Sequence, residues 1–205
     1  MTKKTVSVTL ALALSAAAAT ARAAVTTAAG EVPIPGFRPP AIPFITSDPY
    51  TQNWVHGTAL TDKDVSYWDG LSREMVGLVR VDGAQSYRWL GTSDVLPEDV
   101  PAVEQKSVSV YPTRTVVVSE VPGVLRLTVT TFAPMFAKEL ELLARPTNYV
   151  TIAAEALDGA AHSVQLYFDA TGYNCVNLGT TEVAWGTWAQ GPLAGAKIGS
   201  AKQKI

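Results

Sequence analysis

The chain has 205 residues, of which 17% are charged, and its formal net charge is -2 at pH 7. This balance lacks the basic surface that nucleic-acid binding requires, so nucleic acid is excluded as a partner. Cys175 is the single cysteine. An intrachain disulfide is therefore impossible, and packing alone must stabilise the fold.

The first residues have the order of a secretory signal peptide. Two lysines precede an apolar run over 6–19, and the small residues of Ala21-Arg22-Ala23 follow it. About fourteen apolar residues are too few to cross a bilayer comfortably. The pattern predicts a signal peptide over 1–23 and a secreted, extracellular protein with no membrane contact after cleavage. A buried or membrane-anchoring N-terminal helix is the alternative.

Residues 24–38 are rich in alanine, threonine and proline. Prolines at this density favour extended backbone and exclude a helix. We expect a linker over 24–38 that leads into an edge segment at 42–46. The remaining residues, 39–205, are enough for one domain with a real core.

A hairpin is the clearest local signal in that domain. Residues 76–81 and 85–90 flank Asp82-Gly83, a dipeptide that supplies the positive φ angles of a tight turn. The alternation predicts Val79 and Val81 on one face and Arg80 on the other.

Residues 124–132 are the cleanest alternating segment, with Leu125, Leu127 and Val129 on one face. Further strands are expected over 106–111, 113–119, 149–156 and 162–169, with one or two helical turns within 135–143. Short strands separated by turn residues, with little helix, predict an all-β fold, specifically an antiparallel β-sandwich.

Six segments resemble, in type and order, the N-terminal region of the secreted glutaminase A family. They are PPAIPFITSDPYTQNW, GLVRVDGAQSYRWLG, QKSVSVYPTRT, VLRLTVTTFAP, ARPTNYVTI and HSVQLYFDATG. The resemblance implies a β-sandwich that precedes a helical toroid domain, and hydrolysis of L-glutamine to L-glutamate and ammonia by the complete protein. No toroid is recognisable within 39–205, so we expect a truncated N-terminal sandwich, incomplete at its C-terminal end, whose partner is the missing toroid.

Four residues outside the regular strands are candidates for ligand binding. Asp48, Tyr50, Trp54 and Trp68 combine flat rings with a carboxylate, which suits glutamine or a sugar-like molecule. Packing of the tryptophans over one end of the sandwich, or against the missing domain, is the competing interpretation.

No catalytic residue, metal or cofactor is predicted. Cys175 has no helix N-terminus to activate it, and His56 and His162 are the only imidazoles. Three aspartates, at 62, 64 and 69, suggest calcium, but the EF-hand pattern fails because Tyr67 stands where glycine is required.

The expected function is therefore a non-catalytic scaffold domain of a glutaminase-like amidohydrolase. The main alternative is a free-standing secreted β-sandwich that binds carbohydrate or protein through exposed aromatic residues. A small hydrolase complete in 205 residues is the third hypothesis.

Overall fold

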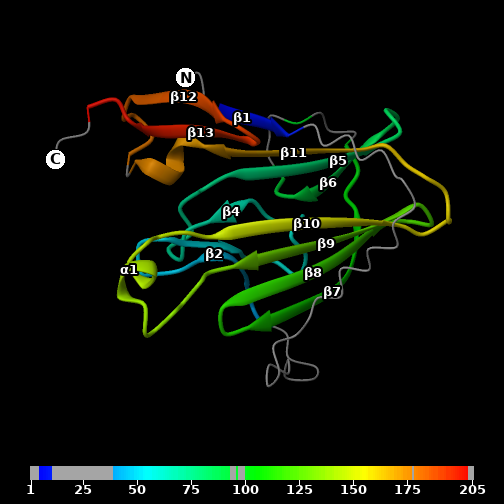
Figure 1. Ribbon diagram of the computed structural model, residues 1–205, viewed down its shortest axis with the longest axis horizontal. Helices are drawn as coiled ribbons and strands as arrows, with labels where there is room; N and C mark the ends of the chain where they lie inside the picture. The colour runs from blue at the N-terminus through cyan, green and yellow to red at the C-terminus, as the bar shows by residue number, and fades with distance from the viewer. Residues whose placement is uncertain (1–4, 11–38, 93–95, 97–99, 177, 203–205) are drawn as a thin grey trace.

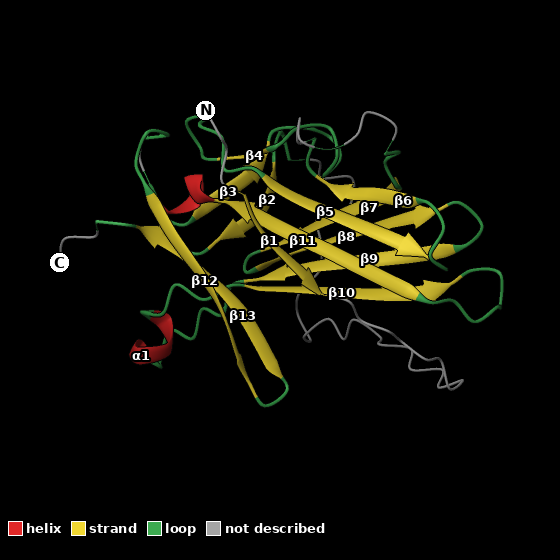
Figure 2. Ribbon diagram, turned by 90° about the horizontal axis from the view of Figure 1, so that it is seen from above, coloured by secondary structure: helices red, strands yellow, loops and turns green. Residues whose placement is uncertain are grey.

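Two four-stranded antiparallel sheets pack face to face in the computed structural model, which describes residues 5–10, 39–92, 96, 100–176 and 178–202 (Figures 1 and 2). The first sheet has the order β1 (Thr5–Leu10), β11 (Val164–Thr171), β5 (Met75–Val81), β6 (Ser86–Leu90). The second sheet has the order β10 (Tyr149–Ala156), β9 (Leu125–Phe132), β8 (Arg114–Val121), β7 (Glu104–Tyr111). The predicted antiparallel β-sandwich is confirmed.

Two smaller sheets complete the architecture. The side sheet consists of β2 (Ile42–Thr46), β3 (Gln52–Val55) and β4 (Val65–Ser66), and β2 packs against β8 and β9. The second is a two-stranded hairpin of β12 (Val183–Gln190) and β13 (Leu193–Ser200), which crosses the first sheet in Figure 2.

The Asp82-Gly83 hairpin forms as predicted. Asp82 has φ 52° and Gly83 has φ 66°, and Arg80 pairs with Ser86 across the turn. Val79 and Val81 are buried, whereas Arg80 is exposed. Positive φ at both turn residues matches the right-handed twist of the strands they join.

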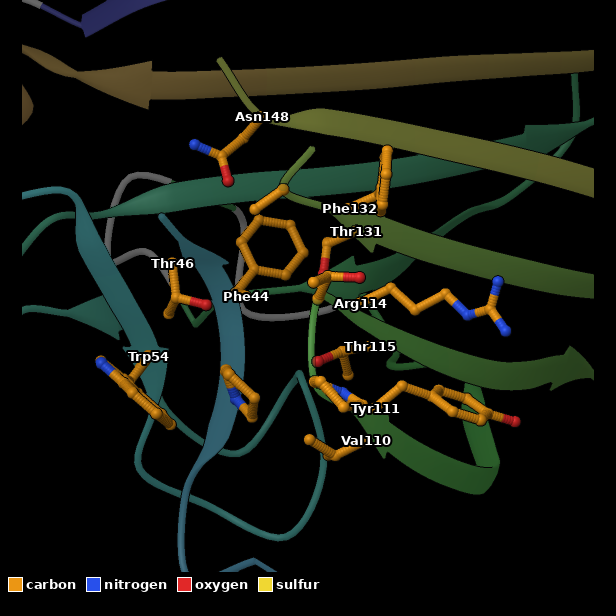
Figure 3. Close-up of a pocket in the computed structure, with 14 residues that line it drawn as sticks. Phe44, Thr46, Trp54, Val110, Tyr111, Arg114, Thr115, Thr131, Phe132 and Asn148 are labelled. Carbon is orange, nitrogen blue, oxygen red and sulfur yellow. The ribbon is translucent and has the colours of Figure 1, made fainter. Parts of the chain in front are cut away.

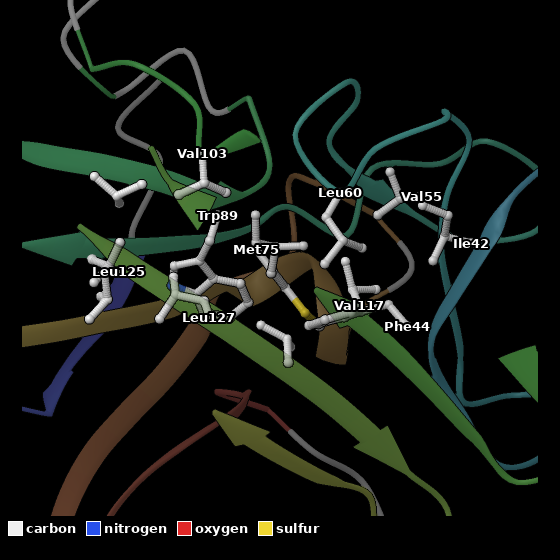
Figure 4. Packing of buried hydrophobic residues seen from close by; sticks show 14 of the residues in the cluster. Ile42, Phe44, Val55, Leu60, Met75, Trp89, Val103, Val117, Leu125 and Leu127 are labelled. Atoms are coloured by element: carbon white, nitrogen blue, oxygen red, sulfur yellow. The ribbon is translucent and has the colours of Figure 1, made fainter. Parts of the chain in front are cut away.

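The core lies between the two large sheets and extends under the side sheet (Figure 4). Trp89 is its largest fully buried side chain, and its ring stacks on Phe168 with a centroid distance of 6.0 Å. Gly77 allows this packing, because a Cβ atom there would lie 2.2 Å from the Trp89 ring. The predicted alternation in β9 is confirmed, since Leu125, Leu127 and Val129 are all buried.

Several elements were not predicted or differ from expectation. The helical segment is one turn, α1 (Leu140–Leu143), while β3, β4, the β12–β13 hairpin and the 3-10 helix η1 (Gly172–Cys175) went unpredicted. Residues 5–10, inside the predicted signal peptide, pair with β11 as an edge strand. The rest of that segment from residue 11, and the predicted linker, lie outside the described residues. In the described part of the chain, no helix has the length and apolar character to span a membrane.

Candidate functional site

The sandwich has two ends of different character. The turn end, at the right of Figure 1, carries the tight turns after β5, β8 and β10. The apolar end, at the left, carries the long β9–β10 connection with α1, the β7–β8 turn and η1. A hydrogen bond from Asn148 Nδ2 to Ser47 Oγ (3.2 Å) adds the β2–β3 turn to the apolar end.

Exposed large hydrophobic side chains gather at the apolar end. Among the described residues, every one of them lies in its connections, at the start of β10, in the turn that precedes β5, in the loop after η1, or on the β12–β13 hairpin: Tyr50, Trp68, Leu71, Met135, Phe136, Leu140, Leu142, Leu143, Tyr149, Leu178, Trp185, Trp188 and Leu193. α1 buries none of its own residues, and Leu140 is 72% exposed. Such a concentration of apolar surface is typical of an interaction surface.

A row of cross-strand partners borders this surface on the outer side of the second sheet. Tyr111, Arg114, Phe132 and Tyr149 occupy matching positions of β7, β8, β9 and β10. The Arg114 guanidinium lies 4.6 Å from the centre of the Tyr111 ring, and the Phe132 and Tyr149 rings stack at 6.2 Å. We call this the aromatic row.

A cavity of about 200 Å³ opens between the side sheet and the apolar end of the second sheet (Figure 3). It is lined by Pro43, Phe44, Thr46, Trp54, Val110, Tyr111, Pro112, Thr113, Arg114, Thr115, Thr131, Phe132, Ala133 and Asn148. Small-molecule sites usually measure about 300–1,000 Å³. This cavity therefore suits one large side chain or a molecule of similar size.

Of the four predicted ligand-binding residues, Asp48, Tyr50 and Trp68 come together on adjoining turns. The Tyr67 hydroxyl donates to the Pro49 carbonyl (2.5 Å), which ties the 67–71 turn to the β2–β3 turn. Tyr50 is 90% exposed and Trp68 63% exposed. Their aromatic faces are therefore accessible to solvent.

The fourth predicted residue, Trp54, and the carboxylate of Asp48 have other surroundings. Trp54 lines the cavity. Asp48 caps its own turn, because its Oδ1 accepts hydrogen bonds from the amides of Tyr50 (2.7 Å) and Thr51 (2.9 Å). Burial works against the ionised form, yet these bonds hold the pKa of Asp48 below its ordinary value. Asp48 is thus occupied within the turn.

The thiol and the imidazoles do not form a catalytic pair in the described structure. Cys175 Sγ donates to the Gly172 carbonyl (3.0 Å), and burial raises the pKa of the thiol, which disfavours a nucleophilic thiolate. His56 is exposed in its loop. His162 lies at the turn end.

His162 joins two turns there. Its Nδ1 faces Asp82 Oδ2 at 2.7 Å, and its Nε2 faces both carboxylate oxygens of Asp158 at 3.0 Å. The hydrogen bonds to Asp82 and Asp158 raise the pKa of His162. The same contacts, with amide donors from Ser163 and Ala160, lower the pKa of the two carboxyls. We call this cluster the histidine latch.

The three aspartates that suggested calcium serve three different turns. Asp62 accepts from Thr58 and Ala59, Asp64 from Thr92, and Asp69 from Leu71. Within the described residues, no group of three or more histidine, cysteine or acidic side chains is placed to hold a metal.

One buried carboxyl escaped sequence reasoning. Asp169 is only 4% exposed, and its oxygens accept from the Tyr167 hydroxyl (2.5 Å) and the Val76 amide (3.2 Å). Burial raises the pKa of Asp169, and the nearby Glu74 charge adds to the effect. The alternation in 162–169 places Asp169 on the face opposite Phe168, whose side chain faces the core. That pattern predicts that Asp169 is exposed to solvent.

Comparisons with known proteins agree with the sequence resemblance. Residues 11–100 match a family described as a domain of unknown function, DUF4964, and residues 113–205 match a second such family, DUF5127. The glutaminase A of Aspergillus oryzae (strain ATCC 42149 / RIB 40) is 28% identical over 139 residues.

That match covers 64% of this chain and 19% of the relative, so the chain spans only a small part of the relative's length. No solved structure matches the chain. The family matches and the relative together identify the chain as an N-terminal region similar to glutaminase A.

Proposed function

We propose that this region is the non-catalytic scaffold of a secreted glutaminase-like amidohydrolase, which in its complete form hydrolyses L-glutamine to L-glutamate and ammonia. The observation that carries the proposal is the concentration of exposed apolar side chains at one end of the sandwich. A helical toroid domain of the same polypeptide is the covering partner. Similarity to the much longer glutaminase A of Aspergillus oryzae supports this choice.

Two elements of the apolar end need such a partner. A four-residue helix without buried residues gains nothing from packing, and isolated helices shorter than about 12 residues are marginal in water. The β12–β13 hairpin has only two strands and exposes Trp185 and Trp188. An isolated two-stranded hairpin is marginal as well. Burial against a second domain would stabilise both.

The first test is the intact mass of the native protein, captured from the culture medium of its source organism with an antibody against residues 39–91. We expect a mass several times that of the 205-residue chain. A mass at or below that of the chain would refute the scaffold proposal, because no covering domain would then exist.

The second test is glutamine turnover by the purified 205-residue chain, followed as ammonia release. We expect none above the buffer rate. Saturable turnover would show that the chain is itself an enzyme. The Cys175→Ser variant would then decide whether the thiol takes part.

The exposure of Tyr50 and Trp68 on adjoining turns favours one other function, binding of carbohydrate through aromatic faces. Saturable quenching of tryptophan fluorescence by a sugar, lost in Trp68→Ala, is the expected result for such a module. Trp185→Ala is the matched control, since Trp185 is equally exposed but lies on the β12–β13 hairpin. Quenching without saturation would remove this candidate.

A further inference from the structure

The cavity at the apolar end has the position and size of an anchor pocket. Its lining includes Ala133, and two half-exposed apolar residues, Met135 and Phe136, follow shortly after on the same connection. Phe132, on its other side, belongs to the aromatic row. Exposed apolar residues therefore adjoin the cavity, as they adjoin the central pockets of protein interfaces.

We propose that this cavity receives one aromatic side chain from the part of the same longer polypeptide that covers the apolar end. The occupant is a segment of the glutaminase-like polypeptide outside these 205 residues, so the inference rests on the proposed function. The inference specifies the site at which the covering part docks and the type of side chain that anchors it.

The volume sets the size of the occupant. At about 200 Å³ the cavity falls below the range of about 300–1,000 Å³ that is usual for small-molecule sites. One large side chain fills such a space. Interface energies are dominated by a few anchors of this kind, and tryptophan and tyrosine are enriched among them.

The walls suit an aromatic occupant that carries a polar group. Phe44, Trp54 and Phe132 line the cavity with Pro43 and Pro112, and polar groups come from four threonines, Arg114 and Asn148. In Figure 3, Phe44 and Trp54 come from the side sheet, whereas Phe132 and Tyr111 come from the second sheet. Rings gain about 0.5–1.5 kcal/mol from stacked or edge-to-face neighbours beyond the area they bury. A cationic occupant would find no compensating carboxylate among the lining residues.

The turn end offers no comparable surface. In the described part of the molecule it carries no exposed large hydrophobic side chain, and the histidine latch and short glycine turns occupy it. The docking surface is thus restricted to one end, and a photo-crosslinker at each end can test it.

The experiment places p-benzoyl-L-phenylalanine at Thr113, on the cavity lining, in the protein produced by its source organism. Irradiation is expected to yield a crosslink to a peptide of the same polypeptide outside residues 1–205, identified by mass spectrometry. The matched control carries the crosslinker at Pro122, which is exposed at the turn end, and should give no such product. A crosslink from Thr113 to another protein, or equal crosslinking from both positions, overturns the proposal.

A second measurement addresses the side-chain preference with the 205-residue chain itself. p-Cresol, which has the ring and hydroxyl of tyrosine, should shift the amide resonances of Thr131 and Thr115 saturably. Thr46→Phe, which narrows the cavity, should weaken this binding about tenfold, equivalent to about 1.4 kcal/mol. Trp185→Ala, on the β12–β13 hairpin, should leave it unchanged. Shifts spread over all exposed aromatic residues, or equal binding in Thr46→Phe, would overturn the anchor assignment.

Failure of the docking proposal is distinguishable from failure of the proposed function. A native protein no larger than this chain removes the proposed function and the occupant together. A larger native protein without a crosslink at Thr113 removes only the docking site. Glutamine turnover by the 205-residue chain removes the scaffold role, while the crosslink still decides the docking site.

Discussion

Two rows of cross-strand neighbours on the second sheet differ in chemistry: one is charged and the other is largely aromatic. Near the turn end, Glu104, Glu120, Arg126 and Glu155 face one another across the four strands. Arg126 binds Glu120 at 3.1 Å and Glu155 at 3.0 Å. Six residues further along β8, β9 and β10, and seven along β7, the aromatic row places Tyr111 and Phe132 beside Arg114.

One set of strands thus supports a charged, solvated row near one end and an aromatic row beside exposed apolar side chains at the other. The charged row is solvated, and its opposite charges compensate one another. It therefore needs no second domain to cover it. The aromatic row continues into exposed leucines and tryptophans that water solvates poorly. The variants that follow change either one end of the sandwich or the core that supports both ends.

The largest effect is expected in the core that supports both rows. Leu127 is fully buried beneath them, and Leu127→Ala should lower the free energy of unfolding by about 2–5 kcal/mol, because it removes apolar contacts and leaves a cavity. Urea unfolding measures the loss. Thr128→Ala, on the outer face of the same strand, should cost less than about 1 kcal/mol. Equal losses would show that Leu127 does not hold the sheets together.

The histidine latch predicts a pH dependence that belongs to the turn end. The raised pKa of His162 means that its stabilisation is complete below the ordinary pKa of 6.5 and is lost as pH rises through the raised value. The lowered pKa values of Asp82 and Asp158 mean that their stabilisation is complete above 3.8 and is lost as pH falls through the lowered values.

The increase in Tm that the histidine latch provides should therefore be largest at mildly acidic pH. Calorimetric scans of the native protein and of His162→Gln, taken from pH 5 to pH 9, measure it. The difference in Tm between the two should shrink as the pH rises. A difference that stays constant over this range would exclude an ionised latch.

A smaller effect is expected in the charged row. Arg126→Gln should lower Tm slightly at low salt, because it leaves Glu120 and Glu155 without their shared cation. The loss should vanish near 1 M salt, where the screening length is about 3 Å. Phe132→Ala is the matched change in the aromatic row, and its effect should depend less on salt because the side chain carries no charge. Identical salt dependence would erase the distinction between the rows.

The smallest effect on stability is expected at the apolar end. Leu140→Ser combined with Leu143→Ser should change the free energy of unfolding by no more than about 0.5 kcal/mol, because both side chains are already exposed. The same change should reduce binding of a hydrophobic dye and self-association measured by sedimentation. A clear loss of stability would mean that α1 already packs within this chain.

Sequence reasoning recovered what depends on near neighbours. The alternation in 124–132, the Asp82-Gly83 turn and the strand 149–156 were predictable, because each is set by side-chain period or by local φ preference. The β12–β13 hairpin was missed because its stability depends on a cross-strand fit. The Trp188 ring lies over Gly195, where a Cβ atom would come within 2.5 Å of it.

The candidate site was predicted only in part. The sequence indicated Asp48, Tyr50 and Trp68 as loop residues, and the structure places them on adjoining turns. It did not indicate that Trp54 lines a cavity with Phe132, because the two residues meet only when the side sheet packs on the second sheet. The His162 latch was hidden for the same reason, since it joins turns eighty residues apart.

By itself, the sequence determined the all-β class, the hairpin, the absence of a disulfide and the resemblance to glutaminase A, all of which follow from composition, local periodicity or ordered segments. Only the tertiary structure decided which end of the sandwich is apolar, which residues line the cavity, and that Asp169 is buried. Strand register and sheet packing set these features, and both depend on contacts between residues far apart in the chain.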